Sequence, residues 1–295
     1  MKDQQLWNLS REAWTALGPH YEPVIERIIE QSGLEGRGWG LLLATLTFEP
    51  EDTTVPHLMV RGPYTAAEIY LARLHNAAIL GFLAEVSPGA FRLTPSGRKA
   101  TMRFIQEARQ AMSSVDPLTP DEAKLLTRQF ERLVQNILDT PPPPDTWSIR
   151  LSYKLMPELD QPLPYIEQSL SCLAGYRDDA HLAAWRQTGL SATALETLTL
   201  LWRGKVGSFD DLIEQLSYRG HSAEVYLDAI VELRRRKFIA GTKRTLRVTS
   251  EGQKFREQVE SDTDRYFYAP WSCLSAADKH NMKRLLTSLR DGLNS

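Results

Sequence analysis

The sequence has few cysteines and no long apolar run. Its 295 residues include two cysteines, Cys172 and Cys273, which cannot form a disulfide framework and lack the spacing of a metal site. No segment approaches the roughly 18 consecutive apolar residues that a membrane-spanning helix needs. The N-terminal segment 1–6 is polar and lacks the apolar stretch of a signal peptide. We therefore expect a cytoplasmic protein without a metal, a cofactor or a membrane contact.

An excess of charge of either sign is also missing. The formal net charge is -2, so the protein as a whole has no basic field that would attract nucleic acid, and any such contact must be local. Catalytic signatures are equally scarce. No glycine-rich phosphate loop is followed by the required lysine, and Asp178, Asp179 and His181 do not share one helix face. We expect a binding protein and not an enzyme.

One pentapeptide occurs twice in the chain. Residues 67–71, AEIYL, return as AEVYL at 223–227, which is a shift of 156 positions. The register continues through FLA at 82–84 and FIA at 238–240, and after a one-residue slip RLT at 92 matches RVT at 247. A common order over about fifty residues indicates duplication. A repeat unit of roughly 150 residues is a domain, because it is far too long for a solenoid repeat.

Four consecutive prolines separate the two copies. Residues 141–144 predict a stiff polyproline spacer, which is typical of a domain boundary. We assign a first, divergent domain to residues 1–139, a proline-rich linker to 140–146 and a second domain to 147–295.

Both copies show the pattern of helix, short hairpin and helix. In the first copy we predict helices over 6–31 (in one piece or broken at Gly18-Pro19), 39–48, 65–83, 95–112 and from 119 to the prolines, with a strand at 90–93. In the second copy we predict helices over 165–185, 191–202, 209–216, 222–237, 250–262 and from 275, with a hairpin at 241–248.

Three details of these helices can be checked. Thr65 and Glu68 have the spacing of a capping box. The helix after Thr65 is apolar nearly all round, which predicts that it is buried. The last helix of each copy carries a packing seam of apolar residues, namely Leu126, Phe130, Leu133 and Ile137 in the first copy and Met282, Leu286, Leu289 and Leu293 in the second.

The second copy, from about Tyr165 to Leu293, resembles a MarR-type winged helix-turn-helix transcriptional regulator. The matching segments are Gly189–Trp202, Phe209–Ser217, Ser222–Arg236, the turn Thr249–Gly252 and the helix from Leu274. In that family two outer helices form the dimer and a winged helix-turn-helix lies between them. The resemblance implies a mainly α fold with small β-hairpin wings. It also implies that the two domains form an intramolecular pseudo-dimer, so that a monomer has internal pseudo-two-fold symmetry.

The resemblance further implies a regulator that binds double-stranded DNA and responds to a small aromatic ligand. The hairpin 241–247 is basic and suits contacts with phosphate or the minor groove, whereas the counterpart 87–90 has no charge. The DNA-binding candidates are Ser222, Tyr226, Lys243, Arg244, Arg247, Arg73 and Asn76. The ligand-binding candidates are Tyr266, Tyr268, Trp271, His181 and Trp185.

A second interpretation stays open from the sequence. Glu224 and Asp228 lie on the expected recognition helix, where phosphates would repel them, and the run Arg234–Lys237 also suits a helix C-terminus. The chain would then be a degenerate winged-helix pair that does not bind DNA and instead binds a protein or a ligand.

Overall fold

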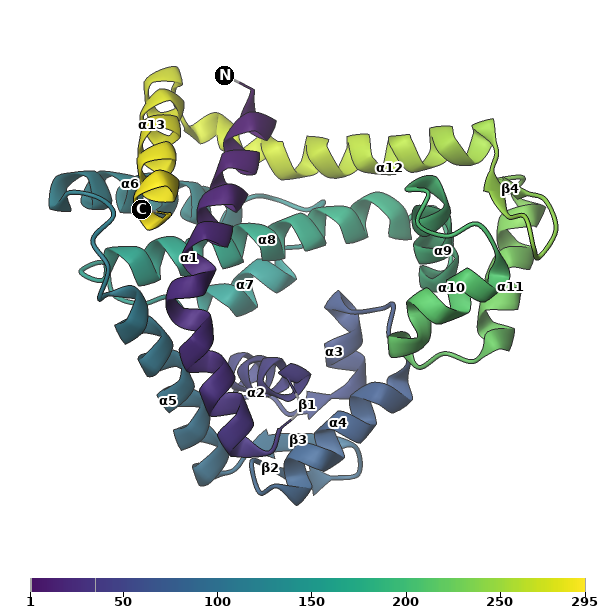
Figure 1. Cartoon of the computed structure of the whole chain (residues 1–295), viewed down its shortest axis with the longest axis horizontal. Coiled ribbons are helices and arrows are strands. Elements are labelled where there is room, and N and C mark those ends of the chain that lie inside the picture. Colours follow the sequence, from purple (N-terminus) through teal and green to yellow (C-terminus); the bar gives the residue numbers. More distant parts are fainter. Residues whose placement is uncertain (1, 35, 295) are drawn as a thin grey trace.

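The computed structural model describes residues 2–34 and 36–294 and is mainly helical, with two small antiparallel sheets (Figure 1). The first half contains α1 (Asp3–Ser32), α2 (Gly36–Phe48), β1 (Thr53–Thr54), α3 (Val55–Arg61), α4 (Ala67–Ile79), β2 (Leu83–Ser87), β3 (Ala90–Leu93), α5 (Pro95–Met112) and α6 (Pro120–Leu138). The second half contains α7 (Trp147–Tyr153), α8 (Pro162–Arg186), α9 (Ala192–Trp202), α10 (Phe209–Leu216), η1 (Ser217–Arg219), α11 (Ala223–Arg235), β4 (Ile239–Ala240), β5 (Arg247–Val248), α12 (Ser250–Tyr268), η2 (Ala269–Cys273) and α13 (Ala276–Leu293). The expected mainly α fold with small hairpins is confirmed.

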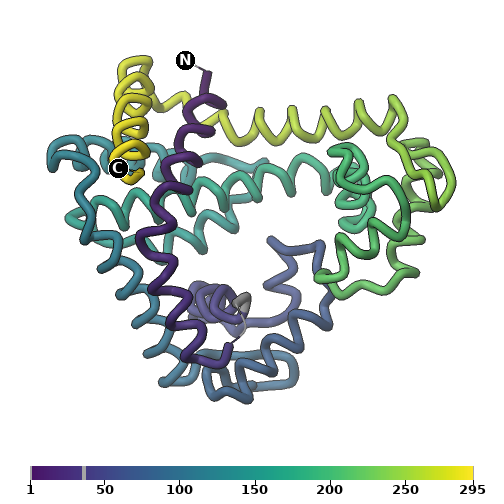
Figure 2. The backbone as a smooth tube through the Cα atoms, viewed as in Figure 1, coloured from purple at the N-terminus to yellow at the C-terminus, as the bar shows by residue number. Residues whose placement is uncertain are grey.

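The elements form two small units, each with helices and a short antiparallel sheet, and a helical hub. In Figure 1 the first unit, α2–α4 with β1–β3, lies at the bottom, and the second, α9–α11 with β4 and β5, lies at the right. We call the third part, where α6 and α13 pack on the first turns of α1 and α8, the hub. Figure 2 shows that α1 begins at the corner that holds α13. Each of the three parts has its own buried apolar cluster.

The apolar seams predicted for the last helix of each half meet in the hub. All eight seam residues are buried and belong to one apolar cluster. Two ion pairs cross the seam in reciprocal fashion: Arg284 pairs with Glu122 at 2.6 Å, and Arg132 pairs with Asp278 at 2.6 Å. Each of these acids is also the capping-box residue of its own helix. Such partly exposed pairs contribute little to stability, so the apolar seam holds the two helices together.

The first long helix of each half packs on the last helix of the other half. Helix α1 contacts α13, and helix α8 contacts α6. At the first of these contacts Lys279 pairs with Asp3 at 2.6 Å and Arg290 pairs with Glu12 at 2.7 Å. The halves are therefore interleaved, and neither hub helix would keep its buried face without the other half.

The entry to the helix after each hairpin is built in the same way in both halves. A threonine N-cap accepts a hydrogen bond from the backbone N–H of a glycine three residues later, and its own N–H donates to a phenylalanine carbonyl at 3.0 Å. A Cβ on that glycine would lie only 1.9 or 2.1 Å from the same carbonyl oxygen, so no larger residue fits. The residues are Phe82, Thr94 and Gly97 in the first half and Phe238, Thr249 and Gly252 in the second.

The structure decides one question that the sequence left open for the first half, and it overturns one local prediction. Helix α1 is continuous through Gly18 and Pro19, because it packs on α5, α8 and α13 and this packing outweighs the backbone hydrogen bond lost at Pro19. Thr65 does not cap α4, since Ala66 is the N-cap residue. The Thr65 hydroxyl is buried and accepts a hydrogen bond from Arg219 at 3.1 Å.

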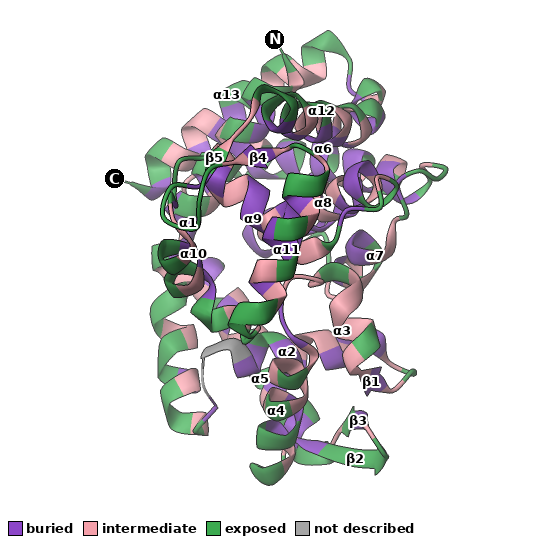
Figure 3. Ribbon diagram, turned by 90° about the vertical axis from the view of Figure 1, so that its right-hand side faces the viewer, coloured by how far each residue is buried: buried purple, intermediate pink, exposed green. Residues whose placement is uncertain are grey.

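The predicted burial of α4 was also wrong. Only Leu74 and Ala77 of this helix are buried, whereas Ile79 is 83% exposed and Leu80 is 39% exposed. Figure 3 shows exposed residues in green along this helix. One face of α4 packs on α2 and β2, and apolar composition alone does not tell which other faces have a neighbour.

Candidate nucleic-acid interface

The second unit is a three-helix core followed by a hairpin. Ser208 caps α10 by accepting from the N–H of Asp211 at 3.1 Å, and the Asp211 carboxylate accepts the N–H of Ser208 at 3.0 Å in return. The apolar faces of α9, α10 and α11 bury one cluster, whose members include Leu195, Leu198, Leu212, Leu216, Ile230 and Leu233. This packing fixes the direction of α11 and of the hairpin after it.

Three predicted DNA-binding cations lie on the hairpin, residues 239–248, which we call the second wing. Two backbone hydrogen bonds anchor it to the start of α10: Phe209 N–H donates to the Lys243 carbonyl at 2.8 Å, and Leu246 N–H donates to the Gly207 carbonyl at 2.7 Å. The side chains of Lys243, Arg244 and Arg247 are exposed. None of the three forms an ion pair within the part of the chain that the structure describes, so their charge is available to a polyanion.

The cationic run at the end of α11 divides into two kinds of residue. Arg236 is structural, because it pairs with Glu232 at 3.5 Å and donates to the Gly189 carbonyl at 2.8 Å. Arg234 and Arg235 are exposed, and Arg234 reaches the wing by donating to the Gly241 carbonyl at 2.8 Å. The exposed members of the run extend the cationic surface of the second wing.

The predicted groove-facing start of α11 needs a correction. Ser222, the N-cap residue, is exposed, but Tyr226 is only 1% exposed and its hydroxyl has no hydrogen-bond partner within the described residues. The ring packs inside the second unit, 5.8 Å from the ring of His221. Tyr226 therefore belongs to the core and cannot reach DNA.

The charges of the first unit are less suited to DNA binding than those of the second wing. Asn76 is exposed and Arg73 is half-buried on α4. The neighbouring His75 lies 3.8 Å from Glu85 on β2, and Arg92 of the first hairpin pairs with Asp52. Since the acids neutralise this hairpin, the first unit offers no counterpart to the cations of the second wing.

The two units touch at the starts of α4 and α11, in a junction formed by residues 64–69 and 219–221. Ala66 N–H donates to the Arg219 carbonyl at 2.9 Å. His221 Nε2 lies 3.1 Å from the Tyr64 carbonyl, and Arg219 donates to Thr65. Every one of these bonds joins one half of the chain to the other.

A glycine permits the closest approach at this junction. Gly220 has φ +75°, and a Cβ there would lie 2.2 Å from Ile69 Cγ1. In two-fold DNA-binding dimers the recognition helices lie about 34 Å apart, one turn of duplex. Here the segment 219–221, directly before α11, contacts the first turn of α4, while Ser222 and Ala223 at the start of α11 remain exposed.

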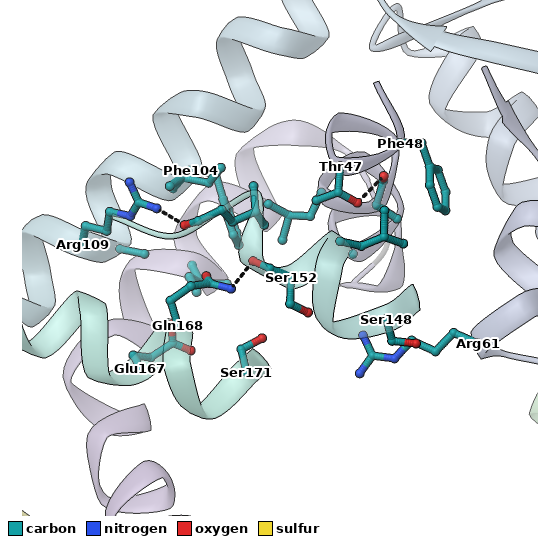
Figure 4. Close-up of a pocket in the computed structure, with 18 of the residues that line it drawn as sticks. Thr47, Phe48, Arg61, Phe104, Arg109, Ser148, Ser152, Glu167, Gln168 and Ser171 are labelled. Carbon is teal, nitrogen blue, oxygen red and sulfur yellow. Dashed lines mark hydrogen bonds between the residues drawn. The ribbon is translucent and has the colours of Figure 1, made fainter. Parts of the chain in front are cut away.

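A cavity of about 470 Å³ lies between the first unit and the segment α7–α8 (Figure 4). Its wall is mostly apolar, with Leu43, Phe48, Phe104 and Trp147 among the lining residues. Its polar lining residues include Arg61, Arg109 and Glu167, and the Glu167 carboxylate accepts from the indole N–H of Trp14 at 3.2 Å. Burial raises the pKa of this carboxyl. We call this space the apolar cavity.

A second cavity, of about 310 Å³, lies between α8, α9 and α12 and is lined by four arginines. We call it the arginine cavity. Positions that line it fall 156 residues after positions that line the apolar cavity, as with Arg177 after Tyr21, Glu196 after Gly40 and Arg203 after Thr47. The two cavities thus occupy corresponding places in the two halves, but they differ in chemistry.

The predicted ligand-binding residues do not form one site. Only His181 lines the arginine cavity, and the other four candidates line neither cavity. Trp271 and Trp185 are buried, and Tyr266 and Tyr268 are half-buried. The rings of Tyr268 and Trp271 pack edge-on to each other and to Phe267, between η2 and the hub. These aromatic residues are packing groups, because the neighbouring rings fill the space that a ligand would need.

The second half matches a known family. Residues 151–294 match the model of a helix-turn-helix family. The matched segment covers α8 to α13 and includes the second wing, so this half of the chain is similar to a helix-turn-helix domain. Comparison with curated proteins and with solved structures gave no match.

Within residues 2–34 and 36–294, no helix is both long and apolar enough to cross a bilayer. In the same ranges, no group of three or more histidine, cysteine or acidic side chains is placed to hold a metal ion.

Proposed function

We propose that the protein is a transcriptional regulator of MarR-like type that binds double-stranded DNA through the second wing. The observation that carries this proposal is the set of exposed cations Lys243, Arg244 and Arg247, none of which has an acidic partner among the described residues, on a segment that matches a helix-turn-helix family. Lys243 also lies over the ring of Phe209, at 5.4 Å. Most protein–DNA affinity comes from contacts with phosphates, and cations held on a rigid hairpin suit them. Arg234 and Arg235 would extend the same contact.

We also propose that the chain is a tandem duplication folded as an intramolecular pseudo-dimer. The repeated order of elements, the matching turns at Gly97 and Gly252, and the two cavities at corresponding positions support this proposal. The interleaving of α1 with α13 and of α8 with α6 is what two-fold symmetry requires. On this view the monomer already has the symmetry of a dimeric regulator.

The ligand that would regulate DNA binding is best placed in the apolar cavity. This space joins the first unit to α7 and α8, so an occupant would contact both halves. Its aromatic and aliphatic wall suits an apolar or aromatic molecule of small size. A ligand that binds one arrangement of the halves better than another would shift the balance between them.

The alternative is a winged-helix pair that has lost DNA binding and acts as a protein- or ligand-binding module. The junction favours it, because Gly220 and Ile69 hold the starts of α11 and α4 against each other. On this view the exposed apolar side chain of Ile79, on α4, would face a partner protein. DNA binding decides between the two functions.

Fluorescence anisotropy with mixed-sequence duplex DNA, measured across a salt series, tests the proposal. The double variant Lys243→Glu/Arg244→Glu is expected to lose most of the affinity, and the slope of log K against log salt should become shallower by about 2. The control is Arg11→Glu/Lys124→Glu, which changes the charge equally at exposed positions of α1 and α6. Absence of binding at low salt, or an equal loss in the control, would favour the alternative.

A further inference from the structure

The arginine cavity contains more positive than negative charge. Its charged lining residues are Arg177, Arg203, Arg219 and Arg256 against Asp178, Glu196 and Glu260. His181 adds no charge at neutral pH, because burial and the nearby Arg256 lower its pKa to about 4. The cavity therefore has one guanidinium group in excess, inside a partly enclosed space where charges are screened less than on the surface.

Each acid of the cavity already has an arginine partner. Asp178 accepts from Arg61, outside the cavity, at 2.7 Å, and Glu196 pairs with Arg219 at 2.6 Å. Glu260 pairs with Arg256 at 2.5 Å and lies 3.9 Å from Arg177. Among the described residues the guanidinium of Arg203 has no such partner and is exposed at the edge of the cavity.

Arg256, which lines the cavity, has one unused hydrogen-bond donor. Its side chain is 2% exposed and is held by Thr199, which accepts from Nε at 2.9 Å, and by Trp202, whose ring lies 5.2 Å from Cζ. Nη1 is buried and has no hydrogen-bond partner within the described residues. A buried charged donor without an acceptor is costly, so an acceptor brought by a ligand would lower the free energy of this site.

Glu196, which lines the same cavity, has one unused acceptor. Both Arg219 contacts go to Glu196 Oε1, while Oε2 is buried and has no partner within the described part of the chain. A ligand that suits both groups must carry an acidic oxygen for Arg256 and a hydroxyl donor for Glu196. Hydrogen phosphate and dihydrogen phosphate have both, whereas sulfate has no hydroxyl.

We propose that the arginine cavity is a binding site for a small phosphate group, with Arg203 and Arg256 as its cationic contacts and Glu196 as its acceptor. The side chain of Tyr64, from the first half, lines the same cavity and packs on Trp185 at a ring distance of 6.2 Å. A phosphate bound here therefore lies directly under the junction. The site is independent of the second wing and of the apolar cavity.

The apolar cavity of the first half lacks three of the charged residues that line the arginine cavity of the second half. At the positions that correspond to Arg177, Glu196 and Arg203 it has Tyr21, Gly40 and Thr47. None of these three residues carries a charge, so the apolar cavity lacks the cations that line the arginine cavity. The two halves thus hold two sites of different specificity in corresponding places.

Calorimetric titration of the full chain with inorganic phosphate, at constant ionic strength and without DNA, tests the site. Arg203→Gln is the first variant, because Arg203 is exposed and its replacement leaves the core unchanged. Arg244→Gln, on the second wing, is the control for the loss of one exposed arginine. We expect saturable binding that Arg203→Gln weakens about tenfold or more and that Arg244→Gln leaves unchanged.

Thermal unfolding gives the second measurement. The melting temperature should rise with the logarithm of phosphate concentration above the dissociation constant, and it should rise less with sulfate. Non-saturable binding, equal weakening in both variants, or equal affinity for sulfate would overturn the assignment. Because DNA is absent, failure of the DNA-binding proposal would leave this result unaffected.

Discussion

Substitution of Gly220 tests whether the two units are in contact at the junction. A Cβ at this position would lie 2.2 Å from Ile69 Cγ1 and 2.7 Å from its Cδ1, and the β-branched side chain of Ile69 has little freedom to move away. Gly220 also has φ +75°, a conformation that costs an alanine about 1–2 kcal/mol. The clash with the first half adds about 1–3 kcal/mol.

Gly204 provides a matched control. Its φ of +64° is similar, and a Cβ there would meet nothing within 4 Å. Gly204→Ala should therefore cost only the backbone part, about 1–2 kcal/mol, whereas Gly220→Ala should cost about 2–5 kcal/mol in total. The free energy of unfolding from urea denaturation measures both values.

A double-mutant cycle with Ile69→Ala isolates the contact. The double variant should recover most of the steric cost of Gly220→Ala, which gives a coupling energy of about 1–3 kcal/mol between positions that lie in different halves. Equal destabilisation by Gly220→Ala and Gly204→Ala, together with no coupling to Ile69, would show that the starts of α4 and α11 are not in contact.

Three further predictions concern stability. Gly97→Ala and Gly252→Ala should each lower the free energy of unfolding by about 2–3 kcal/mol in urea denaturation, because the added methyl meets a backbone carbonyl in both halves. The control Gly40→Ala, whose Cβ would meet nothing within 4 Å, should not destabilise the protein. A cost at only one of the two turns would contradict their equivalence. Burial raises the pKa of Asp179 from 3.8 to about 6, although hydrogen bonds from Ser148 and Ile149 oppose this shift. The contribution of Asp179 to the free energy of unfolding is therefore most favourable below about pH 3.8 and is lost as the pH rises through about 6. Asp179→Asn should remove this part of the pH dependence of unfolding, and parallel curves of unfolding free energy against pH for the two proteins would disprove it. Tyr226→Phe should leave DNA affinity unchanged and should not lower the melting temperature, because the buried hydroxyl has no partner within the described residues; a loss of affinity without a loss of stability would place the residue at the DNA.

The elements of this protein could largely be predicted from its sequence. The helix from Pro120 begins where threonine, proline and glutamate give a capping box, and the second-half helix 209–216 has the predicted bounds. The seam of α6 and α13 also follows from apolar spacing. These signals are local, since a cap, a turn or an apolar stripe depends on residues only a few positions apart.

The candidate site could be predicted only in part. The cations of the second wing were found because a short basic hairpin is a local feature, and the structure places all three at the surface. Tyr226 and the burial of α4 were not predictable. One turn of a helix presents several similar residues, and the face that is buried depends on its neighbours.

The sequence by itself determined most of the helices, the mainly α class and the position of the basic hairpin, because each depends on neighbouring residues. Only the tertiary structure decided that α1 packs on α13 and α8 on α6, that Gly220 meets Ile69, and that four arginines surround one cavity. These contacts join positions that are far apart in the chain. Their formation depends on which buried faces fit together, and local spacing carries no information about that fit.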